Sequence, residues 1–375
     1  MVRKQITQFT QFNRRQIIRS ALLLCVLLTL CVVMCACGGG KSGDSSSSSG
    51  SAESVTEADI EKANEEAKKL AEEISDHEIN VLLGSKADIE ELVQKKAKEL
   101  LGTVKIKVSG DYDVNKVGKY DLKVTLEEKK GAKASETFTL SVIDRDQMEG
   151  DYSFITDKGF LAEVKEGIMT IDGTEIVNKS YSLPPEYGDG LTTETLEAYQ
   201  KMEAQASIDG IYLQPISEYR SYYDQMYIHA QNAAKYGGEK ADTFSAKPGH
   251  SEHQLGEAMD LNSLDQSFAD TTEGQWISNH CAEYGFILRY PQGKTEETGY
   301  MSEPWHVRYV GEDLAKKLYN GGDWITMESY FGIDSEYRKA ALEKEENEAE
   351  GSSDDGNEYY DESGNYDESE EYGYE

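Results

Sequence analysis

The functional interpretation of the chain starts from one stretch of sequence, KPGHSEHQLGEAMDLN from Lys247 to Asn262. It places two imidazoles, several carboxylates and a hydroxyl group among glycines. After the second glycine, polar and apolar residues alternate, which predicts a strand with Ala258, Asp260 and Asn262 on one face. We expect His253 in the loop before this strand and Asp260 on the strand itself.

A second stretch, EPWHVRY, begins at Glu303. Pro304 should interrupt a regular strand here, so that Glu303 and His306 point into one site. Together the two stretches offer His253, Asp260 and His306 as metal ligands. Glu303 adds a base beside them, and a catalytic zinc site needs such a set of three N/O ligands, an open position for water and a base.

These residues alone leave two interpretations open. A histidine and an aspartate seven positions apart also occur by chance in proteins that bind no metal. The second stretch strengthens the metal hypothesis, because a carboxylate and a histidine three residues apart supply a base and a ligand together.

Several motifs, in this order, resemble the VanY-type D-alanyl-D-alanine carboxypeptidases. The residues from Ser251 to Asp260 are similar to that family's Ser-x-His-x-x-Gly-x-Ala-x-Asp signature, and EPWH is similar to its Glu-x-x-His. SEYRS from Ser217 resembles Ser-Gly-Tyr-Arg-Ser, with Glu218 in place of the usual glycine. The resemblance covers roughly residues 150–333, and GFILRYP from Gly285 belongs to it.

The resemblance implies a zinc peptidase related to VanX and the hedgehog-like fold. Its catalytic domain would be α+β, with a small antiparallel sheet flanked by helices. The cofactor would be Zn²⁺, and its ligands would be His253, Asp260 and His306. Glu303 would be the general base, and Arg220 would polarise the scissile carbonyl and stabilise the oxyanion. Ser251 and Gln225 would help to bind the peptide.

The substrate implied by this resemblance is the stem peptide of peptidoglycan, from which the enzyme would remove the terminal D-alanine. An L,D-carboxypeptidase or a cross-link endopeptidase on the same scaffold stays open, because the sequence does not show whether the groove is closed at the leaving-group side. A non-catalytic, lipid-anchored protein that binds the cell wall is a third hypothesis. It predicts the loss of a ligand or of the base, and all of them are present.

The N-terminus predicts a lipoprotein signal peptide over residues 1–36. Basic residues precede an apolar run from Ala21 to Ala36, which is shorter than the about 20 residues of a spanning helix. MCAC from Met34 resembles a bacterial lipobox, so we expect Cys37 to carry a lipid that holds the chain at the extracellular face of the membrane. An uncleaved membrane anchor is the alternative.

Between the signal and the catalytic part, the composition changes three times. Residues 37–54 are rich in Gly and Ser and predict a flexible tether. Helical periodicity over 55–76 predicts a stalk helix. Residues 77–146 contain runs of alternating apolar residues that predict a small β-rich, Ig-like module, although residues 87–101 have a helical pattern.

The catalytic domain is expected over residues 150–335. Its pattern predicts a helix from about Thr193 to Asp209, a strand at Ile211–Leu213 and a helix from Tyr222 to Tyr236. Arg220 would then lie near the start of the last helix, whose N-terminus favours bound negative charge.

Four of the five cysteines lie in the predicted signal, which leaves Cys281 and excludes an intrachain disulfide in the body of the chain. We expect Cys281 in the core of a helix over residues 276–284, rather than in a metal pair with His280.

The net charge of −33 is far too acidic for a nucleic-acid-binding protein, which needs Lys/Arg patches. Residues 343–375 contain 15 acidic residues and one lysine. Such a segment cannot bury a core, and we predict a disordered acidic tail over residues 341–375.

Overall fold

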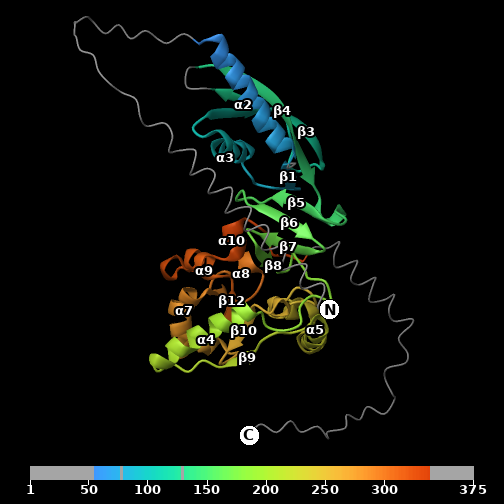
Figure 1. Ribbon diagram of the computed structural model, residues 1–375. Helices are drawn as coiled ribbons and strands as arrows, with labels where there is room; N and C mark the ends of the chain where they lie inside the picture. Colours follow the sequence, from blue (N-terminus) through green and yellow to red (C-terminus); the bar gives the residue numbers. More distant parts are fainter. Residues whose placement is uncertain (1–54, 77–78, 128–130, 338–375) are drawn as a thin grey trace, which may run out of the picture. The chain divides into compact units, whose positions relative to one another are not determined.

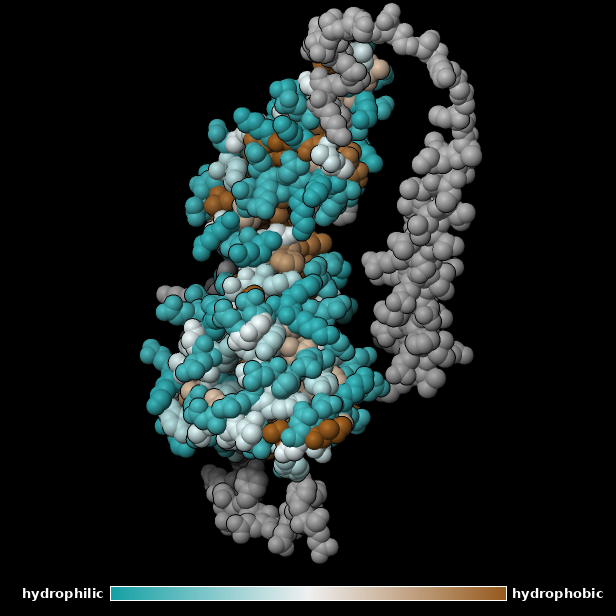
Figure 2. All heavy atoms as spheres, turned by 90° about the vertical axis from the view of Figure 1, so that its left-hand side faces the viewer, coloured by the Kyte–Doolittle hydropathy of each residue, from teal (hydrophilic) through white to brown (hydrophobic). Residues whose placement is uncertain are grey.

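A computed structural model describes residues 55–76, 79–127 and 131–337 of the chain (Figure 1). The predicted signal peptide, the Gly/Ser tether, Cys37 and the acidic tail lie outside these residues. Within the described ranges, no helix has the length and apolar character needed to cross a membrane. Hydrophilic residues cover most of the face shown in Figure 2, with small groups of hydrophobic residues among them.

The first part of the chain forms a sheet covered by two helices. Its elements are α2 (Glu57–Asp76), β1 (Ile79–Leu82), α3 (Ile89–Leu101), β2 (Lys105–Ser109), β3 (Gly118–Glu127) and β4 (Lys133–Ile143). The strands pair in the order β2-β3-β4-β1, with β1 parallel to β4 and the other pairs antiparallel.

The predicted helix over 55–76 is present, but it is not a free stalk. Its apolar stripe includes Leu70 and Ile74, which are buried in the same core cluster as Phe138 and Leu140 of β4. Figure 1 shows α2 lying along β3 and β4. The stripe that the sequence displays is therefore explained by burial against the sheet.

The expectation of an Ig-like module is not confirmed. An Ig-like sandwich packs two sheets face to face, whereas β1 to β4 belong to one sheet. The predicted helical pattern at residues 87–101 is confirmed as α3, whose Ile89 and Val93 join the same core cluster as α2. Helices thus take the place of a second sheet on this face.

The same sheet continues through four short strands: β5 (Tyr152–Ile155), β6 (Leu161–Lys165), β7 (Ile168–Ile171) and β8 (Thr174–Ile176). β5 pairs with β1 at Val81 and Ile155, which completes the order β2-β3-β4-β1-β5-β6-β7-β8. Two-residue loops at Glu166–Gly167 and Asp172–Gly173 join the last three strands, and all four loop residues have positive φ. Loops of this kind match the natural twist of a hairpin.

The second sheet has four antiparallel strands in the order β11-β12-β10-β9. They are β9 (Pro215–Ser217), β10 (Ala258–Leu261), β11 (Phe286–Tyr290) and β12 (Glu303–Tyr309). The α-helices of this part are α4 (Thr193–Ile208), α5 (Tyr222–Tyr236), α6 (Gly238–Ala241), α7 (Thr272–His280), α8 (Thr295–Thr298), α9 (Glu312–Tyr319) and α10 (Met327–Phe331). Short 3-10 turns are η1 (Arg145–Gln147), η2 (Glu252–Leu255), η3 (Gln266–Asp270), η4 (Cys281–Tyr284) and η5 (Asn320–Gly322). The predicted α+β architecture with a small antiparallel sheet flanked by helices is confirmed.

Two local predictions were wrong. The segment Ile211–Leu213 is not a strand, because side chains occupy its backbone groups: the Tyr199 hydroxyl donates to the Leu213 carbonyl and Asn262 donates to the Tyr212 carbonyl. Asn262 in turn has a left-handed backbone (φ 61°) and lies beyond the end of β10.

Cys281 is fully buried at the junction of α7 and η4, as predicted for a core residue. Burial raises the pKa of its thiol, so the thiolate form that binds metals is disfavoured.

Candidate active site

The site begins with pairing between the strands of the second sheet. Asp260 of β10 lies directly opposite His306 of β12 on one side and Ser217 of β9 on the other. Side chains of directly opposed residues in an antiparallel pair lie on the same face. The Oδ1 atom of Asp260 is accordingly 3.0 Å from Nδ1 of His306.

His253 reaches the same place from the turn η2. The turn ends at Gly256, which has a left-handed backbone (φ 71°), and a Cβ atom there would lie 2.0 Å from the carbonyl oxygen of Gly190. Only glycine fits such a position. The Nε2 atom of His253 lies 3.2 Å from Oδ2 of Asp260.

The structure therefore brings the three predicted ligands together. One donor atom from each of His253, Asp260 and His306 lies within 4.8 Å of the others, and all three residues are buried. Two imidazole nitrogens and a carboxylate oxygen form a donor set suited to a catalytic zinc ion.

Contacts behind the ligands fix which ring nitrogen of each histidine faces the site. Nδ1 of His253 is 2.6 Å from the carbonyl oxygen of Glu218 and must donate to it, so Nε2 keeps its lone pair for the site. Glu218 does not need positive φ, and a side chain is thus tolerated where the resemblance has glycine. In His306 the roles are reversed: Nδ1 faces Asp260, and Nε2 lies 3.4 Å from Oε2 of Glu252.

The electrostatics of the cluster favour a cation. Burial lowers the pKa of His306, but hydrogen bonds to Asp260 and Glu252 outweigh burial and raise it to about 9. The surrounding carboxylates therefore stabilise positive charge at this place, as a bound metal ion requires.

Glu303 lies beside the cluster because β12 is irregular. The register with β11 shifts between Leu288 and Tyr290, next to Pro304, which cannot donate to the sheet. Without the shift, residues 303 and 306 would point to opposite faces of the strand. With it, Oε2 of Glu303 lies 3.9 Å from Nδ1 of His306. Glu303 and His306 thus face one site, as predicted, although β12 runs through Pro304 without a break.

Burial raises the pKa of Glu303 to about 7, and although His306 and Arg220 oppose this rise, the like charge of Asp260 supports it. A carboxyl group with a pKa near the working pH can both accept and return a proton. Glu303 is therefore placed and tuned as the resemblance implies for the base.

Arg220 is held in a fixed orientation at the edge of the cluster. Its Nη1 donates to Oε1 of Gln225 and its Nη2 to Oγ of Ser217, both at 2.8 Å, while Nη2 lies 3.9 Å from Oδ2 of Asp260. Nε2 of Gln225 donates to the carbonyl of Ala246 at 2.5 Å. The amide of Gln225 is thus occupied mainly in holding Arg220.

A cavity of about 370 Å³ opens onto these groups. All the residues predicted for the site line it: His253, Asp260, His306, Glu303, Arg220, Ser251 and Gln225. Tyr290, Tyr300 and Trp305 contribute aromatic walls. Lipidation of Cys37 stays a prediction, since that residue lies outside the described ranges.

Sequence reasoning missed three residues that contribute to the site. Ser217 orients Arg220, Tyr300 lines the cavity, and Glu252 contacts a predicted ligand. Ser217 and Glu252 are inside the quoted motifs, but nothing in their spacing shows which neighbour they reach.

Comparisons with known proteins show which family the chain resembles. The VanY family model, described as D-alanyl-D-alanine carboxypeptidase, matches residues 188–312. The putative carboxypeptidase YodJ of Bacillus subtilis is 34% identical over 209 residues, which cover 48% of this chain and 76% of that protein.

Two solved structures are also similar in sequence. The LD-carboxypeptidase LdcB is 32% identical, with a TM-score of 0.40 and coverage of 44% of this chain and 94% of that one. A vancomycin-resistance D,D-pentapeptidase VanY, solved in complex with Zn(II), is 33% identical, with a TM-score of 0.37 and coverage of 41% and 96%. The family match and the extent of the similarity to YodJ decide the assignment. The chain belongs to the VanY family of D-alanyl-D-alanine carboxypeptidases, as its motifs predicted.

Proposed function

We propose that this chain is a zinc carboxypeptidase that removes the terminal D-alanine from peptidoglycan stem peptides at the outer face of a bacterial membrane. The observation that carries the proposal is the convergence of three metal-ligand side chains, a carboxyl group with a pKa near 7 and a fixed guanidinium on one cavity. A wall-binding protein without activity has no need for this complete set.

Zinc would be held by His253, Asp260 and His306, and when bound it would supply Lewis-acid polarisation and lower the pKa of the attacking water. Glu303 takes the proton of that water and returns it to the leaving amine. Arg220 faces the negative charge that develops on the carbonyl oxygen. Hydrogen bonds to Ser217 and Gln225 hold the guanidinium group of Arg220 in place.

Peptide binding is assigned to Ser251 and Gln225. Ser251 is buried in the cavity wall next to the ligand His253. Gln225 acts on the substrate through Arg220, because its amide oxygen accepts from that guanidinium. Tyr290 and Trp305 line the same cavity and offer apolar surface to the substrate.

The test uses purified full-length protein and the two natural lengths of stem peptide. Pentapeptide and tetrapeptide stems are incubated with the protein, with a chelator, and with the chelator followed by zinc. Mass spectrometry should show loss of one alanine from the pentapeptide, abolished by the chelator and restored by zinc.

The other outcomes separate the alternatives. Release from the tetrapeptide alone would replace the proposal by an L,D-carboxypeptidase. Release from neither peptide by zinc-loaded protein would refute carboxypeptidase action, and cross-linked dimers would be the next substrate to examine.

The location is proposed from the N-terminal sequence. Basic residues, the apolar run Ala21–Ala36 and the MCAC motif support lipidation at Cys37. A Cys37→Ala protein should lose the lipid mass and leave the membrane fraction. Retention in that fraction would favour the uncleaved anchor. With either kind of membrane attachment, the module that contains β1 to β4 would serve as a spacer between the membrane and the catalytic part.

A further inference from the structure

We infer that Glu252 is a positioning residue of the metal centre, holding His306 in the orientation and tautomer that leave its Nδ1 free for the metal. Glu252 follows Ser251 in the signature stretch and also lines the cavity, and its carboxylate contacts Arg289 of β11 and His306 of β12. It is 1% exposed. Its Oε2 lies 3.4 Å from Nε2 of His306, and its Oε1 accepts from Nε of Arg289 at 2.8 Å.

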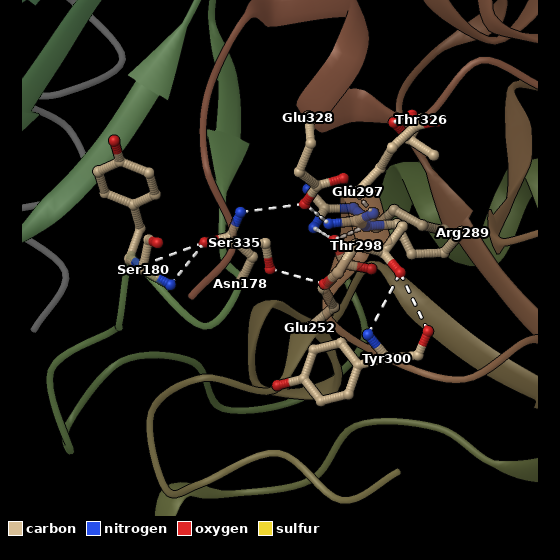
Figure 3. Close-up of polar contacts among 12 residues, drawn as sticks. Asn178, Ser180, Glu252, Arg289, Glu297, Thr298, Tyr300, Thr326, Glu328 and Ser335 are labelled. Carbon is tan, nitrogen blue, oxygen red and sulfur yellow. Dashed lines mark hydrogen bonds and ion pairs between the residues drawn. The ribbon is translucent and has the colours of Figure 1, made fainter. Parts of the chain in front are cut away.

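Glu252 is itself held by a buried chain of polar contacts (Figure 3). Besides its contact with Glu252, Arg289 donates two hydrogen bonds, of 2.9 and 2.6 Å, to the carboxylate of Glu328 in α10. Asn178 donates to the same Glu328 at 3.0 Å and to the Asp334 carbonyl at 2.9 Å. The carboxylate of Glu252 is therefore fixed from the side opposite His306.

Each of the two arginines that contact Glu252 also has a second carboxylate partner. Arg289 has Glu328 as a bidentate partner, and the second buried arginine, Arg308, is paired with Glu257 as well as lying 3.4 Å from Oε1 of Glu252. Burying a further carboxylate carries a desolvation cost. Arg289 and Arg308 contact Oε1 of Glu252, whereas Oε2 faces the imidazole, so the geometry points to His306 as the group that this carboxylate serves.

The two histidines of the centre are thus supported differently. His253 donates to a neutral backbone carbonyl, whereas His306 has a carboxylate behind it. A carboxylate behind a ligating histidine fixes the tautomer and makes the ring a stronger donor to the metal, and its loss costs 10–100-fold in metal affinity or activity. His306 would therefore be the more tightly held ligand.

The experiment compares Glu252→Gln with the matched variant Glu328→Gln in the full-length protein. Both remove one negative charge from the same buried chain and both contact Arg289, but Glu328 does not reach His306. The zinc dissociation constant is measured by competition with a chelating dye, and the melting temperature of each metal-free protein is recorded. We expect the constant to rise about 10–100-fold in Glu252→Gln and less than about threefold in Glu328→Gln, with similar losses of melting temperature.

Equal zinc affinity in Glu252→Gln and the unaltered protein would overturn the inference. Equal loss in both variants would also overturn it, because it would show a structural role alone. If Glu252→Gln does not fold, ¹⁵N-histidine NMR of the unaltered zinc-loaded protein decides. The inference requires a proton on Nε2 of His306 and is refuted if the proton is on Nδ1.

The inference rests on the proposed zinc site, but different results would refute the positioning role and the proposed function. Absence of zinc binding in the unaltered protein would refute the proposed function. Normal zinc binding in the unaltered protein, together with no change in Glu252→Gln, would refute only the positioning role.

Discussion

Replacing Glu303 by glutamine should abolish activity and, in the metal-free protein, raise stability at alkaline pH. Burial, together with the like charge of Asp260, raises the pKa of this carboxyl group from 4.5 to about 7 against the opposing effect of His306. A raised pKa means that the folded state holds the proton more tightly than the unfolded chain. The resulting stabilisation is complete below pH 4.5 and is lost as the pH rises to about 7.

The magnitude follows from the two pKa values. The difference between 4.5 and about 7 corresponds to about 3 kcal/mol of unfolding free energy. The Glu303 side chain still exposes 13% of its surface, so solvent screening reduces the expected loss to about 2 kcal/mol. Glutamine carries no charge at any of these pH values, and the variant should escape this loss.

The assay is urea unfolding of both proteins with a chelator present, at pH 5 and at pH 8. All other titrating groups are shared, so the difference between the two proteins reports Glu303 together with its coupling to neighbours such as His306. We expect a difference below about 1 kcal/mol at pH 5, and an advantage of about 2 kcal/mol for Glu303→Gln at pH 8. A difference that does not change with pH would refute the reasoning about the buried carboxyl group.

The activity of the same variant tests its chemical role. Loss of a general base should lower the turnover of the stem pentapeptide at least about 10²–10⁴-fold while zinc binding is retained. Full activity would contradict the assignment of Glu303.

Three further substitutions test other parts of the structure. Arg220→Lys should lower turnover about 10²-fold without changing zinc affinity, because lysine cannot make both hydrogen bonds that fix the guanidinium; a parallel fall in zinc affinity would indicate a different role. Gly256→Ala should destabilise the protein by at least about 3 kcal/mol, whereas Gly173→Ala, which also has positive φ but open space around it, should cost about 1 kcal/mol in urea unfolding. Leu70→Ala in α2 should cost about 2–5 kcal/mol because Leu70 is fully buried, and the exposed Ile60→Ala should cost less than about 0.5 kcal/mol; equal effects would mean that α2 does not pack on the sheet.

The sequence by itself determined the features that depend on neighbours along the chain. Alternation predicted β10, apolar residues on one side predicted α4 almost to the residue, and the bounds predicted for the next helix are those of α5. Pro304 has no N–H for the sheet wherever it stands, so its effect on β12 could be foreseen. The candidate ligands were recognisable for a similar reason, since their residue types and spacing carry the chemistry.

Tertiary structure alone decided what depends on contacts between distant segments. The apolar stripe of α2 shows that the helix has a buried face, but not that β4 covers it. Residues 211–213 are apolar enough for a strand, yet side chains of Tyr199 and Asn262 bind their backbone. In the sequence Glu252 is one of several carboxylates in a motif. Its role becomes visible only in the folded chain, where Arg289 and His306, some 40 and 50 residues away in the sequence, contact it. Periodicity records which face of an element is buried, whereas the partner on that face is fixed only when the whole chain packs.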